Sequence, residues 1–151
     1  MKKGKILCQN RKAHYNYHIS ETLEAGLVLL GPEVKSLREG RASLVESHAK
    51  VKKGEIFLYD MHITPYPYAR DMNINPLRQR KLLLNKREIR RLIGKTEEKG
   101  FTLIPTKVYL NKGFIKVEIA LAKGKRKYDK RQALKEKELK KEMDAAKKYN
   151  Y

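Results

Sequence analysis

Residues 122–131 hold the densest set of side chains able to bind a charged partner. Seven of these ten residues are charged, six of the seven are basic, and Tyr128 lies inside the run. Lysine and arginine pair with phosphates and an aromatic ring stacks on an unpaired base, so the run could bind RNA. An isolated basic run is more often a solvated linker. Its position favours the functional interpretation, because it joins an apolar body to a basic tail.

Other reactive residue types do not assemble into a catalytic or metal-binding pattern. His14 and His18 lack a third ligand at useful spacing and a His-Glu-x-x-His arrangement. Gly94-Lys95-Thr96 resembles the end of a phosphate-binding loop, but the first glycine of that motif would fall at Ile89. No paired carboxylates or activated nucleophile support an active site. The sequence therefore predicts no enzyme, no metal, no cofactor and no small-molecule substrate.

Charge dominates the composition. The 151 residues carry a net charge of +19, with +12 in residues 1–122 and +7 in residues 123–151. Such an excess argues for a polyanionic partner, either nucleic acid or an anionic membrane surface. No apolar run approaches the roughly 20 residues of a membrane-spanning helix. With no apolar signal-peptide region and a single cysteine, Cys8, the chain is expected to be soluble and cytoplasmic.

The first third of the chain is predicted to form strands and one short helix. In residues 10–19, aromatic and aliphatic side chains alternate with polar ones, which is the period of a strand. Residues 27–30 are predicted to continue as a buried strand. A short helix should follow, with Pro32 near its first turn and Gly40 past its end.

Two hairpins and a long loop are expected in the remainder of the body. Residues 42–63 read as two strands that turn at residues 52–55. Residues 64–77 contain three prolines and no apolar period, so they are predicted to be a loop. Residues 101–122 form the clearest hairpin, with a turn at residues 111–113.

One amphipathic helix is predicted between those hairpins. Asn85 is placed to cap it, with Glu88 three residues later in a capping-box arrangement, and Gly100 is expected to end it. Its core-facing residues would be Ile89, Leu92 and Ile93. About six strands with a capped helix between them predict a mainly β fold with flanking helices, as an OB-like antiparallel barrel that spans residues 1–122.

Residues 123–151 are predicted to be a basic hinge and tail. The large apolar residues of residues 132–148 are Leu134, Leu139 and Met143, which are too few to bury a core face. The composition nevertheless favours a helix. The tail is therefore expected to be disordered when free and helical when bound.

Two acidic residues stand out in this basic chain. A carboxylate beside RNA repels phosphate, so Glu24 and Glu33 could be structural, each pairing a neighbouring arginine. Alternatively, one of them could accept hydrogen bonds from an exposed base edge or orient a basic side chain against the RNA. The sequence leaves both interpretations open.

Several blocks, in order along nearly the whole chain, coincide with those of one known family. The blocks are Asn10-Arg11-Lys12-Ala13, Glu24-Ala25-Gly26, Gly31-Pro32-Glu33-Val34-Lys35-Ser36-Leu37-Arg38, Arg78-Gln79-Arg80-Lys81-Leu82-Leu83-Leu84, Gly100-Phe101-Thr102-Leu103-Ile104-Pro105, and Ala122-Lys123-Gly124-Lys125 with Asp129-Lys130-Arg131. Each block alone is weak, but together they are specific. The chain resembles the SsrA-binding protein (SmpB) family, the tmRNA-binding proteins of bacterial trans-translation.

The resemblance implies that the barrel grips the tRNA-like domain of tmRNA near its elbow. It carries the following residues into or beside the RNA-binding face: Asn10, Arg11, Lys12, Tyr15, Tyr17, Glu24, Glu33, Lys35, Arg38, Arg78, Arg80, Lys81, Leu83, Lys123, Gly124 and Lys125. Tyr15 departs from the family pattern, which usually has histidine there, so an imidazole contact at that position is in doubt.

The resemblance also implies a role for the tail on a stalled ribosome. There it would enter the decoding centre, contact small-subunit RNA and lie along the empty mRNA channel, with elongation factor Tu as a partner within the tmRNA complex. The tail residues concerned are Tyr128, Asp129, Lys130, Arg131, Leu139 and Met143. Family members often have histidine at Tyr128, and a tyrosine can stack on a base equally well.

Three rival interpretations share parts of this pattern. Another basic RNA-binding module, such as a ribosomal protein or assembly factor, shares the composition but not the ordered blocks. An RNA-processing enzyme would need a catalytic constellation that the sequence lacks. An anionic-membrane binder would need an apolar face that the basic tail nearly lacks.

Overall fold

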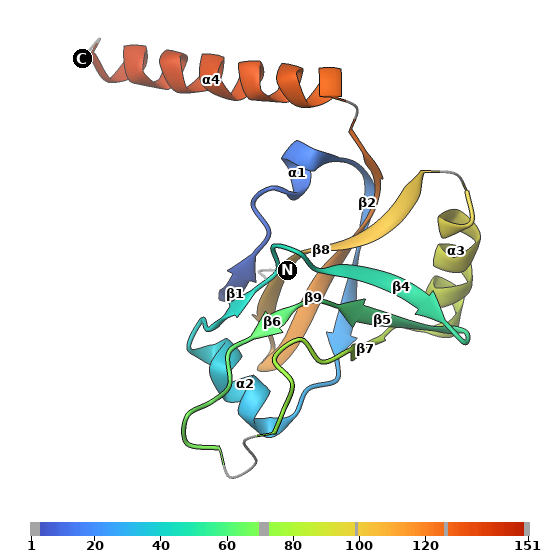
Figure 1. Ribbon diagram of the computed structural model, residues 1–151. Helices are drawn as coiled ribbons and strands as arrows, with labels where there is room; N and C mark the ends of the chain where they lie inside the picture. The colour runs from blue at the N-terminus through green and yellow to red at the C-terminus, as the bar shows by residue number, and fades with distance from the viewer. Residues whose placement is uncertain (1–3, 70–72, 99, 126, 150–151) are drawn as a thin grey trace.

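Six antiparallel strands form a closed ring at the centre of the molecule (Figure 1). The computed structural model describes residues 4–69, 73–98, 100–125 and 127–149. The ring strands are β2 (Tyr17–Leu27), β4 (His48–Lys52), β5 (Glu55–Tyr59), β7 (Arg80–Leu83), β8 (Phe101–Asn111) and β9 (Phe114–Gly124). They pair in the order β8-β4-β5-β7-β2-β9, and β9 pairs back onto β8. The predicted barrel of about six strands is confirmed.

Short elements surround this ring. Strand β1 (Ile6–Gln9) pairs with β8, and β3 (Ala42–Ser43) pairs with β6 (His62–Ile63). The helices are α1 (Ala13–Asn16), α2 (Gly31–Arg38), α3 (Lys86–Thr96) and α4 (Lys127–Tyr149). In Figure 1, α2 and α3 lie at opposite ends of the barrel, and α4 extends away from it above α1. Within the described part of the chain, no helix is both long enough and apolar enough to cross a membrane.

The barrel interior is filled by alternate residues of its strands. Val117, Ile119 and Leu121 of β9 are buried, and they pack with residues of β2, β4, β5, β7 and β8. Leu37 of α2 and Leu92 of α3 are fully buried in the same cluster. Burying a leucine stabilises a fold by about 1.5–3 kcal/mol. The two helices therefore close the ends of the barrel with their apolar faces and leave their basic faces in solvent.

A bulge in β2 divides that strand into two halves. The register with β9 shifts by one residue between Ile19 and Glu21. Because strand side chains alternate between faces, one extra residue reverses the face of everything beyond it. Before the bulge, Ile19 packs on a small outer cluster that includes Ala13 of α1; after it, Leu23 packs on the main core. Glu24 consequently points outward.

The local signals for the second helix and hairpin are confirmed. Asn85 caps α3, its side chain accepting a hydrogen bond from the backbone N–H of Glu88 at 2.9 Å. The helix ends at Thr96, earlier than the predicted stop at Gly100. Lys112 and Gly113 connect β8 to β9 with φ of 52° and 81°, the left-handed geometry of a tight hairpin turn.

Residues 10–19 do not form the single strand predicted for them. Residues 13–16 form α1, in which the backbone N–H of Asn16 donates to the carbonyl oxygen of Lys12 at 2.9 Å. The helix lets Ala13 reach the outer cluster, where only 1% of it is exposed. In a continuous strand, Ala13 would not reach this cluster. Packing therefore outweighs the alternating sequence pattern.

Two further boundaries differ from the predictions. Strand β2 ends at Leu27, and Val28 and Leu30 are each 43% exposed, so residues 27–30 are not a buried strand. Strand β9 continues to Gly124, two residues beyond the predicted end of the barrel. The tail is helical in the structure over Lys127–Tyr149. Disorder of the free tail stays a prediction.

A buried ion pair connects α2 to β7. Glu33 of α2 is 3% exposed and Arg80 of β7 is 0% exposed. The Arg80 Nε atom donates to Glu33 Oε2 at 2.8 Å, and Arg80 Nη1 donates to the carbonyl oxygen of Met61 at 2.6 Å. Glu33 Oε1 accepts from Arg78 Nη2 at 2.6 Å and from the backbone N–H of Leu30 at 2.9 Å. The pair thus fixes α2, β7 and the β5–β6 connection together.

The partners of Glu33 also set its protonation. Burial alone would raise the pKa of the Glu33 carboxyl group, but the hydrogen bonds from Arg78, Leu30 and Arg80 and the charge of Arg80 outweigh burial. The pKa of Glu33 is therefore lowered from its ordinary value. The carboxylate stays ionised inside the protein because Arg78, Leu30 and Arg80 donate hydrogen bonds to it.

Replacing Arg80 with alanine should destabilise the protein strongly. The Arg80→Ala variant leaves the Glu33 carboxylate buried without its main partner, and breaking a buried pair in this way costs about 3–5 kcal/mol. Urea unfolding measures the loss. Arg78→Ala is the matched control, because Arg78 is 31% exposed and should cost much less. Equal losses for the two variants would contradict the structural role of Arg80.

The same pair predicts a loss of stability in acid. Since the pKa of Glu33 is lower in the folded state, its carboxylate contributes stability above the unfolded-state pKa, and the contribution is lost as pH falls through the folded-state pKa. The Glu33→Gln variant lacks this titration. The stability difference between wild type and Glu33→Gln, measured by urea unfolding from neutral pH downward, should narrow in acid. A constant difference would show that Glu33 does not titrate this way.

Candidate nucleic-acid interface

The outer surface of four neighbouring strands brings together a carboxylate, a leucine, an amide and a lysine. We call this surface the Glu24 face; it consists of Glu24 of β2, Leu83 of β7, Asn111 of β8 and Lys116 of β9. Gly26 lies opposite both Leu83 and Lys116 in the sheet. A Cβ atom on Gly26 would lie 3.1 Å from the Leu83 Cβ atom, so glycine allows the close approach. These residues come from distant parts of the chain and meet only through strand register.

Glu24 is held by neutral donors. The Tyr109 hydroxyl donates to Glu24 Oε2 at 2.5 Å, and Asn111 Nδ2 lies 3.3 Å from both carboxylate oxygens. Burial, followed by the hydrogen bond to Glu24, raises the pKa of Tyr109, so its hydroxyl remains a donor. Two oxygens have four acceptor positions, which leaves room for an external donor. The Glu24 carboxylate is thus fixed in direction and exposed to solvent.

Leu83 and Lys116 complete the face. Leu83 is 52% exposed, although it lies in a strand. An exposed apolar side chain beside a glycine suits a flat partner such as a base or a ribose. Lys116 lies in the next strand but one, and its Nζ atom is 6.0 Å from the ring centroid of Phe114. An acceptor for base edges, an apolar contact and a cation for phosphate are the elements of RNA recognition.

The structure places Glu24 and Glu33, whose roles the sequence left open, in different environments. Glu33 pairs with arginines inside the protein, which is the structural interpretation. Glu24 is exposed, and its hydrogen bonds come from Tyr109 and Asn111. Of the two residues, Glu24 is the one whose exposure is compatible with the functional interpretation, which stays a prediction. Lys116, Asn111 and Tyr109 were missed by sequence reasoning, because only the pairing of β2, β9 and β8 sets them beside Glu24.

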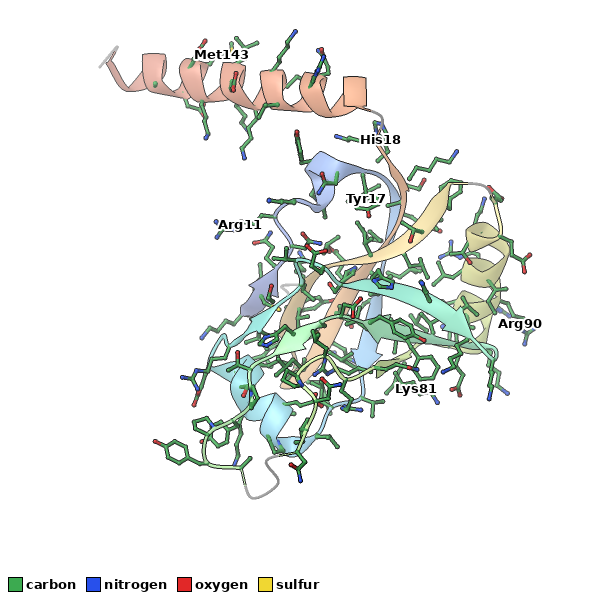
Figure 2. All side chains as sticks on the ribbon, in the orientation of Figure 1. Arg11, Tyr17, His18, Lys81, Arg90 and Met143 are labelled. Atoms are coloured by element: carbon green, nitrogen blue, oxygen red, sulfur yellow. The ribbon has the colours of Figure 1, made fainter. Side chains whose placement is uncertain are left out.

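A second group of predicted residues gathers where the chain enters the tail. We call it the hinge side, made of residues 10–17 and 123–125. His18 is opposite Lys123 in the sheet, Tyr17 is opposite Gly124, and the backbone N–H of Lys125 donates to the Asn16 carbonyl oxygen at 2.8 Å. Arg11 and Tyr17 lie beneath α4 in Figure 2, whereas Lys81 and Arg90 lie on the other side of the barrel. Two blocks a hundred residues apart thus form one surface.

The hinge side contains an open groove of about 570 Å³. Asn10, Lys12 and Tyr17 line it on one side, and His48 and Lys50 of β4 line it on the other. Asn10 is held by its backbone N–H, which donates to the Thr106 carbonyl oxygen at 2.7 Å. Arg11 and Tyr15 are exposed beside the groove. The structure therefore brings together all five predicted residues from residues 10–17, and adds His48 and Lys50.

The remaining predicted residues lie on α2, on β7 and, for Arg78, just before β7, and they differ in exposure. Lys35 and Arg38 are exposed on α2. Lys81 is partly exposed, and its Nζ atom pairs with Glu55 Oε1 at 2.8 Å. Arg80 is fully buried with its donors directed to Glu33, Met61 and Pro76. The Arg80 side chain is thus held inside the fold, and its place in or beside the RNA-binding face stays a prediction.

The predicted decoding-centre residues lie on α4. The side chains of Tyr128, Asp129 and Lys130 fall outside the described residues. Arg131 is exposed, and Leu139 and Met143 are each 59% exposed. Figure 2 shows Met143 far from the barrel. The role of these residues stays a prediction.

Metal binding and thiol chemistry both depend on where the His, Cys, Asp and Glu side chains lie. Among residues 4–69, 73–98, 100–125 and 127–149, no group of three or more His, Cys, Asp or Glu side chains is placed to hold a metal ion. Burial raises the pKa of the Cys8 thiol to about 11. A thiol with so high a pKa is mostly protonated at neutral pH and is a poor nucleophile.

Comparison with known proteins identifies the family. The sequence profile of the family described as SmpB protein matches residues 7–149. The chain belongs to the SmpB family. It is 56% identical over 143 residues to the SsrA-binding protein of Geobacillus kaustophilus (strain HTA426), covering 95% of this chain and 92% of that protein. It is also 56% identical over 146 residues to the SsrA-binding protein of Syntrophobacter fumaroxidans (strain DSM 10017 / MPOB), covering 97% and 91%.

A solved structure shares the fold. It is described as "tmRNA-SmpB: a journey to the center of the bacterial ribosome", and it superposes with a TM-score of 0.67 at 47% sequence identity. The match covers 83% of this chain and 92% of that chain. The family suggested by the sequence blocks is confirmed, and so is the mainly β fold with flanking helices.

Proposed function

We propose that this protein binds the tRNA-like domain of tmRNA and delivers it to stalled ribosomes for trans-translation. The observation that carries the proposal is the family match over residues 7–149, which includes both the barrel and the tail. Relatives more than half identical are named for binding SsrA, and a solved relative is described with tmRNA and the bacterial ribosome. The Glu24 face supplies the chemistry that such binding needs.

The two parts of the chain have separate tasks in this proposal. The barrel, residues 1–122, holds tmRNA through the Glu24 face and through exposed cations around it. The hinge and tail, residues 123–151, enter the decoding centre and the empty mRNA channel. The hinge side connects the two, because Lys125 is bonded to α1 of the barrel and α4 starts at Lys127. An RNA held by the barrel is thereby linked to the tail through the short segment that follows β9.

The protein acts in this role by binding and positioning, without catalysis of its own. Elongation factor Tu would join as a partner within the tmRNA complex. It would not need a dedicated binding surface on the barrel. A factor with these partners works in the cytoplasm. Preference for tmRNA over a generic tRNA at moderate salt tests the whole proposal against the alternative of a general basic RNA-binding module.

Removing the charge of Glu24 should weaken tmRNA binding. From net charge alone, the opposite is expected, because removing a negative charge should raise the affinity for RNA. A loss of affinity would therefore indicate a specific contact by Glu24. We expect Glu24→Gln to bind about tenfold more weakly, because a charge-assisted hydrogen bond to a base edge is lost. Thermal unfolding should change little, because the glutamine oxygen can still accept from Tyr109. Filter binding with the tRNA-like domain measures the effect.

Glu97→Gln is the matched control for Glu24→Gln. Glu97 is exposed just after α3, away from the Glu24 face, and the charge change is the same. It should bind tmRNA at least as tightly as wild type. If Glu24→Gln binds as tightly as Glu97→Gln, Glu24 is not part of the RNA site.

A chain that ends at Lys127 should separate RNA binding from ribosome rescue. The barrel strands end at Gly124, so the truncation leaves every barrel strand complete. We expect nearly full affinity for tmRNA and failure of peptide tagging on ribosomes stalled on a message without a stop codon. Tagging in a purified translation system is the measurement. Normal tagging by the truncated chain would contradict the role of the tail.

A proline in α4 tests whether the tail must be helical. Proline in a helix interior costs about 3 kcal/mol, whereas an unstructured tail would tolerate it. Leu139→Pro should therefore bind tmRNA normally and lose tagging. Leu139→Ala is the control, because alanine keeps the helix while removing the same exposed side chain. Equal tagging by the two variants would mean that helix formation is not required.

A further inference from the structure

Two tyrosines project from the loop beside α2. Tyr68 is 83% exposed, the largest exposed fraction among the exposed large apolar and aromatic side chains of the described residues. The rings of Tyr66 and Tyr68 meet edge to face, with centroids 5.6 Å apart and planes at 69°. The Nζ atom of Lys35 lies 5.3 Å from the centroid of the Tyr66 ring. The loop therefore presents an aromatic pair with a cation on one side.

The loop that carries these rings is held in place. Ser36 Oγ donates to the Thr64 carbonyl oxygen at 2.6 Å, and the backbone N–H of Thr64 donates to the Arg41 carbonyl oxygen at 3.0 Å. Pro65 and Pro67 restrict the backbone on either side of Tyr66. Rings on a restrained backbone lose little entropy when they bind. The loop is therefore anchored at Thr64, just before the two tyrosines.

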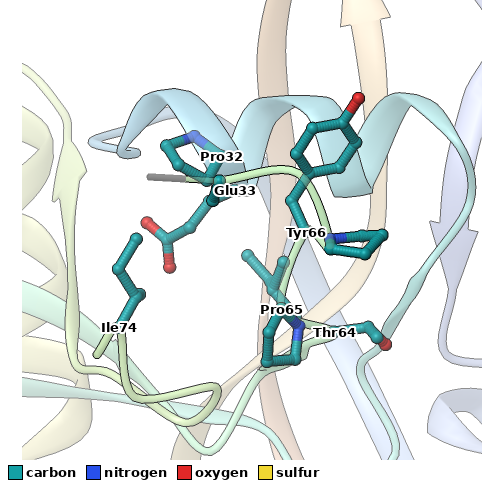
Figure 3. A pocket seen from close by; sticks show the side chains of 9 residues that line it. Pro32, Glu33, Thr64, Pro65, Tyr66 and Ile74 are labelled. Atoms are coloured by element: carbon teal, nitrogen blue, oxygen red, sulfur yellow. The ribbon is translucent and has the colours of Figure 1, made fainter. Parts of the chain in front are cut away.

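Tyr66, but not Tyr68, lines a small and mostly apolar pocket. Figure 3 shows Pro65 and Tyr66 on one side of it, with Pro32 and Ile74 across from them. Its volume is about 80 Å³. This is smaller than the roughly 150 Å³ cavity that accommodates benzene in a protein core. The pocket cannot enclose a nucleobase, so a flat ligand would lie on the outer face of Tyr68.

We propose that Tyr68, supported by Tyr66, stacks on an unpaired nucleotide of the tmRNA that the barrel binds, while Lys35 pairs with a nearby phosphate. Aromatic rings next to cations are the recurring means of holding unpaired RNA, because every base offers a flat π-face and every nucleotide a phosphate. Arg38, one turn further along α2, is also exposed and basic. This inference rests on the proposed function and adds residues to its RNA site.

Two observations favour tmRNA as the ligand of this loop: the basic charge of α2, and the short link between β2 and α2. Glu33, the one acidic residue of α2, is neutralised by Arg78 and Arg80, so the exposed charges of α2 are Lys35 and Arg38. Strand β2 ends at Leu27 and α2 begins at Gly31, so only three residues separate the strand that carries Glu24 from the helix that carries Lys35. An RNA on the Glu24 face lies within reach of this loop.

The experiment uses the full chain and the tRNA-like domain of tmRNA. Tyr68→Leu keeps an apolar side chain but cannot stack, whereas Tyr68→Phe can. We expect Tyr68→Leu to weaken binding about 5- to 100-fold with an unchanged salt slope, and Tyr68→Phe to bind as wild type does. Lys35→Ala should instead flatten the slope of log affinity against log salt by about 0.7–0.9, one phosphate contact.

A direct probe is available because the chain contains no tryptophan. In Tyr68→Trp, the single indole should be quenched by the tRNA-like domain over the same concentration range in which the RNA binds. Because Tyr68 is so exposed, the thermal unfolding of all these variants should match that of wild type. A matched melting curve excludes misfolding as the cause of lost affinity.

The outcomes separate this inference from the proposed function. If wild type shows no preference for tmRNA over tRNA, the proposed function fails. If wild type prefers tmRNA but Tyr68→Leu binds it as well as Tyr68→Phe does, only the stacking site is overturned. Quenching of Tyr68→Trp by ribosomes and not by the tRNA-like domain would also overturn it, because the loop would then meet ribosomal RNA.

Discussion

The buried pair of Glu33 and Arg80 is the interaction on which the outer surface of this protein depends. Placing two charges inside a small barrel is unfavourable unless their hydrogen bonds are satisfied, and here the backbone and Arg78 complete them. The pair fixes the start of α2 against β7. The orientation of α2 in turn decides that Leu37 closes the barrel while Lys35 and Arg38 face solvent. An interior contact thereby determines which cations a partner can reach.

Glu33 and Glu24 differ in their surroundings, and the surroundings suit them to different roles. Glu33 is surrounded by arginines and the backbone N–H of Leu30, and its lowered pKa keeps it ionised as a structural anchor. Glu24 is exposed and is oriented by the hydroxyl of Tyr109 and the amide of Asn111. Neutral donors direct a carboxylate without cancelling its charge. In the proposed complex, such a carboxylate would discriminate among RNAs by accepting hydrogen bonds from base edges, whereas the many cations of a chain with a net charge of +19 attract any RNA.

Sequence patterns predicted the elements whose signals are local. The Asn85 cap and the tight turn before Phe114 depend on a few adjacent residues, and both appear where expected. The short helix at Ala13 was missed because its cause is distant: an alanine that fits against Ile104 and two alanines of β9. The burial of Arg80 was missed for the same reason. A basic residue in a basic run looks exposed until the closed ring and α2 surround it.

In contrast to α1, which depends on packing against distant residues, α4 is favoured by its local helix propensity and has almost no tertiary support. Leu134, Leu139 and Met143 are 45–59% exposed on α4, so they contribute little burial. Pairs such as Glu136 and Lys140 add about 0.2–0.5 kcal/mol each, and most of the stability of a helix in a protein comes from tertiary packing, which α4 largely lacks. Its population therefore responds to small changes in surroundings. A polyanionic channel that binds the exposed lysines can supply the missing free energy, so a weakly stable helix is suited to form where the mRNA channel is empty.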